Sequence, residues 1–201
     1  MPCKRHKNNL TRRCVKMSEE ISFDIDQRIL DTIFQEFDVN RLIDNFAKNI
    51  ENKKEEIEDV AKKVFGEYGR RLMTRAIELG EKYSDKTHEV IEEVAEKTGV
   101  GAFPHVCQRF LEIFNMGTQR KTLTVVVSNT SQLTHSVGPC VFLNAIKEKC
   151  GEDVAKLLTC KHINLSALEV LYNNLNLSVD VRMEASIPSE GYCQFTALQK
   201  T

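Results

Sequence analysis

The chain has 201 residues, of which 41% are hydrophobic and 28% are charged, and its net charge is −1. These values are typical of a soluble protein that can bury a core of its own, and the near-neutral charge disfavours nucleic acid and anionic membranes as partners. No run approaches the ~20 apolar residues of a membrane span, and no apolar signal segment follows the basic N-terminus, so we expect a cytoplasmic protein. Seven widely spaced cysteines are unlike the framework of a small disulfide-bonded secreted domain.

Residues 1–16 differ in composition from the rest of the chain. They contain no acid and six basic residues, which are Lys4, Arg5, Lys7, Arg12, Arg13 and Lys16. We interpret this segment as a disordered extension, with an arm for nucleic acid or acidic partners as one alternative. A metal-binding segment is another alternative, with the ligands Cys3, His6 and Cys14. The composition changes at Met17, which predicts one domain over residues 17–201, with a helical N-terminal part at 17–53 and a core at 54–201.

The first part of this domain has a helical pattern throughout. Apolar residues recur at three- and four-residue steps in four stretches, which are residues 21–51, 54–82, 84–99 and 103–115. The first stretch predicts two short helices divided near Asp38 and Asn40, either of which could cap the second. The second stretch contains Gly66 and Gly69, which indicate close packing or a kink without deciding between them.

The second part of the domain has a mixed pattern. β-Branched residues predict a strand over residues 121–130. The next two predicted helical regions cover residues 141–151 and 152–175. Strict alternation from Val179 to Ile187 predicts a half-buried strand, and a turn at Pro188–Gly191 returns the chain through Cys193. This order predicts an α+β fold, in which N-terminal helices pack with a small antiparallel sheet that ends in a C-terminal β-hairpin.

Two cysteines are the best placed chemical groups. Alternation along the last strand turns Cys193 toward the buried face of the sheet. Gly138-Pro139 precedes Cys140, and since proline favours the first helical position, Cys140 is expected in the first turn of a helix. There the helix dipole would stabilise a thiolate that acts as a nucleophile or as a metal ligand. An ordinary buried cysteine at a helix start is the alternative.

A metal site is a further hypothesis. Cys140, Cys160 and Cys193 could converge with His135 or His162 as a fourth ligand, which would form a tetrahedral zinc site, or could form an open three-ligand site that holds water. Cys160 and His162 point about 200° apart on a regular helix, so they cannot share an ion unless the helix breaks there. Two other cysteines are expected to stand outside the site: Cys107 as a core residue, and Cys150 at the far end of the helix from Cys140.

The motif Gly138-Pro139-Cys140, the later Cys160 and the closing run from Glu190 to Phe195 resemble the pattern of the L-2-amino-thiazoline-4-carboxylic acid hydrolase-like family. Residues 65–71 resemble the helical half of that family, and the match covers about residues 55–198. The ending also resembles the related 4-vinyl reductase ligand-binding domain. The resemblance implies an α+β small-molecule-binding domain that either opens a thiazoline ring or senses a small ligand, in some members with a cysteine-rich zinc site.

The chain departs from the zinc-bearing sensors on the strand before the last turn. Arg182 and Ala185 stand where those domains place a further acid and a cysteine, although Glu184 is adjacent. Any zinc site here would therefore need Cys140 and Cys160 as partners of Cys193.

Two hypotheses of function follow. The first is a hydrolase for a small C–N or C–S ring compound, in which Cys140 is the thiolate nucleophile or a metal ligand and His135 is the general base. The second is a non-catalytic sensor or carrier that binds a small ligand or zinc and dimerises through its N-terminal helices. A domain whose cysteines only pack is the third alternative.

Overall fold

The computed structural model describes residues 25–51, 57–83, 86–99, 103–118 and 122–200. Its helices are α1 (Gln27–Glu36), α2 (Val39–Ile50), α3 (Ile57–Lys82), α4 (Lys86–Thr98), α5 (His105–Gly117), α6 (Val141–Cys150), α7 (Glu152–Lys156), α8 (Lys161–Asn174) and α9 (Ile187–Glu190). Its strands are β1 (Thr122–Ser128), β2 (Gln132–Gly138), β3 (Val179–Ala185) and β4 (Cys193–Gln199). The fold is α+β, as predicted. The basic segment 1–16 lies outside the described residues.

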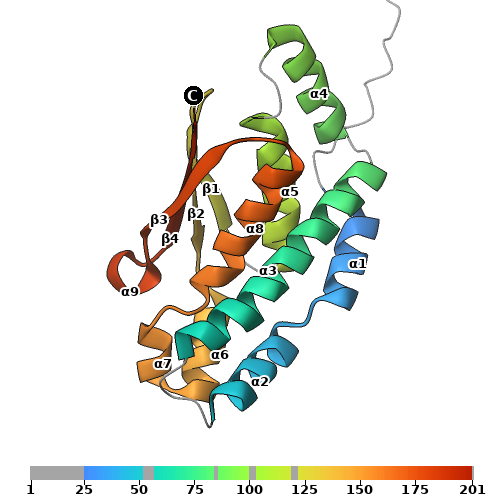
Figure 1. Cartoon of the computed structure of the whole chain (residues 1–201). Helices are drawn as coiled ribbons and strands as arrows, with labels where there is room; N and C mark the ends of the chain where they lie inside the picture. The colour runs from blue at the N-terminus through green and yellow to red at the C-terminus, as the bar shows by residue number, and fades with distance from the viewer. Residues whose placement is uncertain (1–24, 52–56, 84–85, 100–102, 119–121, 201) are drawn as a thin grey trace, which may run out of the picture.

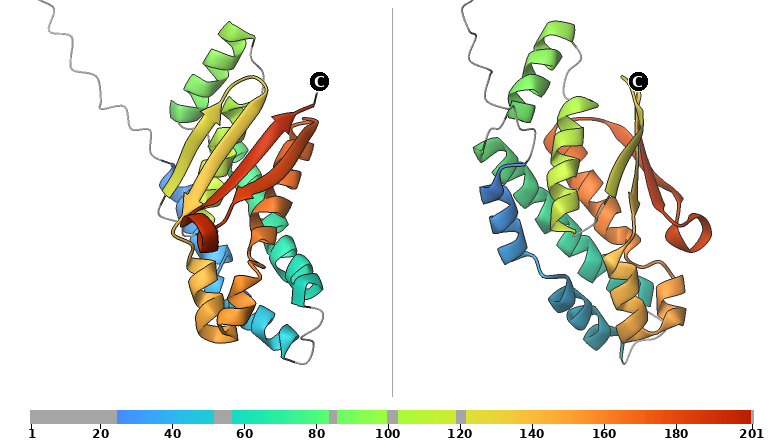
Figure 2. Two further views of the ribbon diagram at one scale, coloured as in Figure 1. Left: turned by 90° about the vertical axis from the view of Figure 1, so that its left-hand side faces the viewer. Right: turned by 180° about the vertical axis from the view of Figure 1, so that it is seen from behind.

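The four strands form one antiparallel sheet in the order β1-β2-β4-β3. Helices α5, α8 and α3 lie on one side of this sheet, as Figures 1 and 2 show. The side chains of Leu133, Val137, Phe195 and Ala197 are buried toward that side and join a hydrophobic core that also includes residues of α1 and α2. The closing hairpin of β3 and β4 is confirmed, and its connection contains the short helix α9.

The predicted division of the N-terminal helices is confirmed. Asp38 is the N-cap of α2, and its side chain accepts hydrogen bonds from the backbone N–H groups of Asn40 and Arg41. This satisfies two donors that the first turn of a helix leaves without backbone partners. The described helix α3 lies inside the predicted stretch 54–82.

Close packing, rather than a kink, explains the two glycines of α3. A Cβ atom added at Gly69 would lie 2.1 Å from the backbone oxygen of Ile163 in α8, and one at Gly66 would lie 3.0 Å from the Ser166 hydroxyl. Helices α3 and α8 therefore cross with their backbones almost in contact, which only a residue without a side chain permits. This crossing fixes the start of α8.

Two features of the C-terminal half differ from the prediction. Strand β2 was not predicted, because His135 interrupts the apolar alternation of Leu133 and Val137. The long helix predicted over residues 152–175 is broken into α7 and α8, since Leu158 adopts a φ of 53°, which an α-helix excludes. Among the described helices, none has the length and apolar character needed to cross a membrane.

Candidate functional site

The ends of two central strands bring Cys140 and Cys193 to the same end of the sheet. Strands β2 and β4 are neighbours, and Val137 pairs with Cys193. One residue after Val137, a Cβ atom at Gly138 would lie 3.6 Å from the Gly191 oxygen and 3.7 Å from Tyr192 Cβ. The segment that leads into Cys140 therefore runs beside the segment that leads into Cys193.

Helix α8 begins at this same end of the molecule. The chain leaves α7, turns at Leu158 and enters α8 through Cys160; Figures 1 and 2 show the start of α8 at the end of the molecule that holds α6 and α7. Cys140, Cys160 and Cys193 are only 5%, 4% and 5% exposed, and all three belong to the hydrophobic core. We call these three residues the cysteine end of the fold.

The position of Cys140 differs slightly from the prediction. It is the N-cap residue of α6, with φ −103° and ψ 111°, and helical geometry begins only at Val141. Cys160 is likewise the N-cap of α8. Both cysteines thus stand at the positive end of a helix dipole.

No disulfide bond joins the five cysteines of the described ranges, which are Cys107, Cys140, Cys150, Cys160 and Cys193. Within those ranges, no three His, Cys, Asp or Glu side chains form a group that could hold a metal ion. The zinc site with Cys140, Cys160, Cys193 and His162 therefore has no preformed ligand set there. It stays a prediction that would need the thiols to turn toward one another.

The two candidate histidines have different neighbours. His135 lies on β2, where its buried ring stacks on Phe195 with 5.7 Å between the ring centroids. It precedes Cys140 by five residues in the chain. Its role as general base stays a prediction. His162 lies on α8, where its Nε2 atom is 2.9 Å from Glu58 Oε1.

Glu58 is a partner that sequence reasoning did not identify. Its Oε1 atom also accepts a hydrogen bond from Lys161 Nζ at 2.8 Å, so one carboxylate joins the start of α3 to the start of α8. Partial burial raises the pKa of Glu58, but the hydrogen bonds from Lys161 and His162 outweigh it and leave the pKa below its ordinary value. Glu58 and His162 are 104 residues apart in the chain, and no local sequence pattern signals such a contact.

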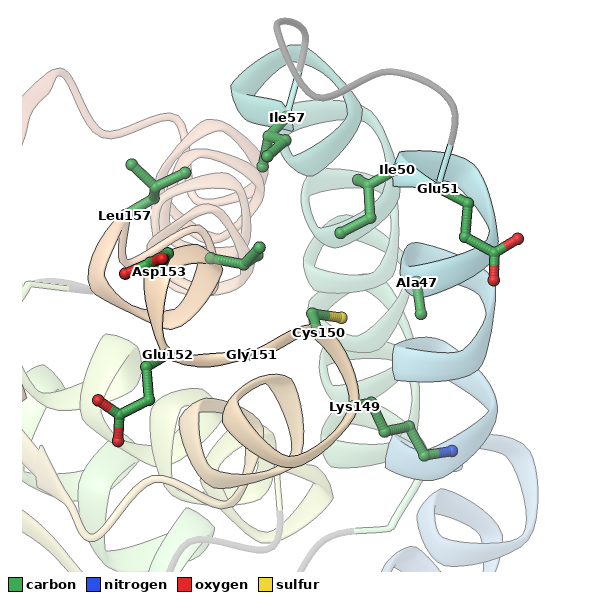
Figure 3. A pocket seen from close by; sticks show the side chains of 11 residues that line it. Ala47, Ile50, Glu51, Ile57, Lys149, Cys150, Gly151, Glu152, Asp153 and Leu157 are labelled. Carbon is green, nitrogen blue, oxygen red and sulfur yellow. The ribbon is translucent and has the colours of Figure 1, made fainter.

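The two cysteines that we expected outside the site do lie elsewhere. Cys107 is fully buried on α5, and desolvation raises the pKa of its thiol to about 12. Cys150 ends α6 and lines an open pocket of about 670 Å³ between α2, α3 and the α6–α7 corner. Figure 3 shows its sulfur directed toward Ala47 of α2, beneath Ile50 and Ile57. Partial burial raises the pKa of the Cys150 thiol, and nearby Lys149 opposes that shift.

Three comparisons with known proteins add little to this geometry. No protein-family model matches the sequence, and no curated protein matches it. Two solved structures do match: an Fe(II) unliganded H-NOX protein from K. algicida and a point mutant of it. Each is 13% identical, with a TM-score of 0.40, over 87% of this chain and 94% of the other. At this TM-score the likeness carries no information about the ligand or activity of this chain.

Proposed function

We propose that this chain is a non-catalytic sensor or carrier domain that binds a small ligand or a soft metal ion at its cysteine end. The main support is that three segments distant in sequence, the start of α6, the start of α8 and the start of β4, each contribute one buried cysteine at the same end of the fold. Packing alone does not require sulfur at three such positions, since valine or alanine would fill a similar volume. A reduced, cytoplasmic chain is part of this proposal, because free thiols persist there.

Burial of the thiols favours binding over catalysis. A nucleophile must reach its substrate, whereas the residues of the cysteine end are about 95% buried. The open pocket described above has Cys150, and none of these three cysteines, in its wall. The cysteine end is thus better suited to a ligand that enters when the ends of the strands open.

Zinc is the candidate ion. Thiolates would come from Cys193, which begins β4, and from Cys140, which follows the adjacent strand β2 by two residues. Cys160 would supply a third ligand. Bound zinc would keep these thiols deprotonated and would tie the sheet to α8. His162 would have to give up its bond to Glu58 to serve as a fourth ligand, so it is a weaker candidate ligand than the three cysteines.

A hydrolase with Cys140 as nucleophile is the second candidate. It is favoured by one observation, the position of Cys140 at the N-cap of a ten-residue helix. In that mechanism the cysteine would attack a small C–N or C–S ring compound of the 2-amino-thiazoline-carboxylate type, with His135 as general base.

Metal analysis of protein purified under reducing conditions separates the two candidates. The binding proposal predicts about one equivalent of zinc. Cys140→Ser and Cys193→Ser should each lose it, whereas the matched variant Cys107→Ser should keep it. Absence of metal together with rapid alkylation of Cys140 alone at neutral pH would support the hydrolase instead. Absence of metal with slow alkylation of all three residues would contradict both the zinc site and the Cys140 nucleophile.

The partner expected for the N-terminal helices is a second copy of the chain. Phe34 on α1 supports this proposal, because its side chain is 50% exposed although it is large and apolar. Phe34→Asp should convert a dimer to a monomer in sedimentation analysis, and an unchanged sedimentation coefficient would contradict this arrangement.

A further inference from the structure

Helix α4 has an exposed face that the described part of the fold does not cover. Its principal contacts are with α5, and in Figures 1 and 2 it lies at the end of the molecule opposite α6 and α7. Val90 and Val94 remain 37% and 38% exposed on this helix. A further segment of chain could cover these exposed apolar side chains.

The net charge of this helix is negative. Its sequence holds four glutamates, Glu89, Glu92, Glu93 and Glu96, against two lysines, Lys86 and Lys97. Glu92 lies 3.1 Å from His88 Nε2. The side chains of Glu92 and Glu96 are both exposed. A basic segment would therefore be attracted to this face.

The same chain contains such a segment. Residues 1–16 carry six Lys and Arg and no acid, which leaves 22 basic and 29 acidic residues, a net charge of −7, on residues 17–201. Leu10 and Val15 lie within the basic run and could cover apolar surface, as could the aliphatic stems of its lysines and arginines.

The described chain starts beside the base of α4. Its first described residue, Ile25, is three positions before Arg28, whose guanidinium lies 4.4 Å from the centroid of the Tyr83 ring. Tyr83 in turn precedes the first residue of α4 by three positions. The N-terminal segment is thus tethered next to the acidic helix.

The tether is long enough. The eight residues between Lys16 and Ile25 span up to about 30 Å when extended. A helix of thirteen residues is about 20 Å long, so the basic run can reach every turn of α4.

We infer that residues 1–16 dock in cis on α4, with their Lys and Arg side chains against Glu92 and Glu96 and their apolar atoms over Val90 and Val94. Each exposed ion pair contributes only about 0–1 kcal/mol, but a short tether gives an effective concentration in the mM range. Docking is therefore populated at low ionic strength and lost at high salt, where charges are screened within about 3 Å at 1 M.

Amide hydrogen exchange of the full chain tests this inference through a charge-swap cycle. Arg12→Glu with Arg13→Glu should speed exchange of the Val90 and Val94 amides about threefold, as expected for the loss of weak ion pairs. Glu92→Lys with Glu96→Lys should have the same effect, and the combination of all four changes should restore protection.

The control reverses two exposed acids on other helices, through Glu148→Lys and Glu169→Lys. It should leave the α4 amides unchanged. The inference is overturned if the swap does not restore protection, if the native protection persists in 1 M salt, or if protection grows with protein concentration. The last result would mean that a second copy, rather than the same chain, covers α4.

Discussion

Helix α6 carries a cysteine at each end, and the two lie in opposite surroundings. Cys140 at its start is 5% exposed and adjoins the strand that carries Cys193. Cys150 at its end is half-buried in the wall of an open pocket. The two ends of one helix thus carry a buried thiol and a more exposed thiol. Chemical reactivity and binding capacity are therefore expected at different cysteines.

The largest expected effect concerns the crossing that holds the cysteine end together. Gly69→Ala would force a methyl group against the Ile163 carbonyl, three residues after Cys160, and should lower the free energy of unfolding by about 3 kcal/mol. Urea denaturation measures this loss.

Gly66→Ala is the matched control for that change. Its methyl group would meet only the Ser166 hydroxyl and the flexible end of Arg70, and alanine gains about 1 kcal/mol of helix propensity. The free energy of unfolding should therefore change by less than about 1 kcal/mol. Equal losses in both variants would show that the close crossing does not control stability.

Alkylation of the folded, metal-free protein compares the two ends of α6 directly. Cys150 should react with iodoacetamide more than about tenfold faster than Cys140 or Cys193, because a buried thiol reacts only after local opening. Peptide mass spectrometry measures the three rates, and Cys107 provides the reference for a thiol in the core. Faster reaction at Cys140 would indicate an accessible nucleophile and would reverse the comparison.

The pH dependence of the Cys150 reaction sharpens the same contrast. Burial disfavours its thiolate, so the midpoint of the rate profile should lie above the ordinary thiol pKa of 9.0. In urea the midpoint should fall to that ordinary value. A native midpoint below 9.0 would mean that Lys149 outweighs burial and that Cys150 is an activated thiol.

The smallest effect is expected at Glu58, which ties the start of α8 to α3. Its lowered pKa means that the carboxylate stabilises the fold above its unfolded-state pKa of about 4.5, and that this contribution is lost as pH falls through the lower folded-state pKa. Because 43% of the side chain is exposed, Glu58→Gln should cost less than about 1 kcal/mol at pH 7. Denaturation at pH 7 and pH 3 measures the difference between variant and native protein, which should shrink at pH 3.

The exposed Glu81 of the same helix gives the control for that comparison. Glu81→Gln should leave stability unchanged at both pH values. A loss from Glu58→Gln that is equally large at pH 3 would assign its effect to packing rather than to charge.

Local patterns predicted most of the fold and less of the site. The cap at Asp38 and the alternation through Val181 and Met183 depend on neighbouring residues, so the sequence reveals them. The break at Leu158 could not be foreseen, because nothing in a leucine signals a positive φ. The bond between Glu58 and His162, like the approach of Gly69 to Ile163, depends on the crossing of α3 and α8, which only the folded chain displays.

Cobalt(II) titration of the reduced, metal-free protein tests the central claim most directly. Binding at the cysteine end predicts thiolate-to-cobalt absorbance that saturates near one equivalent, disappears in Cys140→Ser and in Cys193→Ser, and persists in Cys150→Ser. Full absorbance in both of the first two variants, or no absorbance in the native chain, would contradict a metal-binding function for this end of the fold.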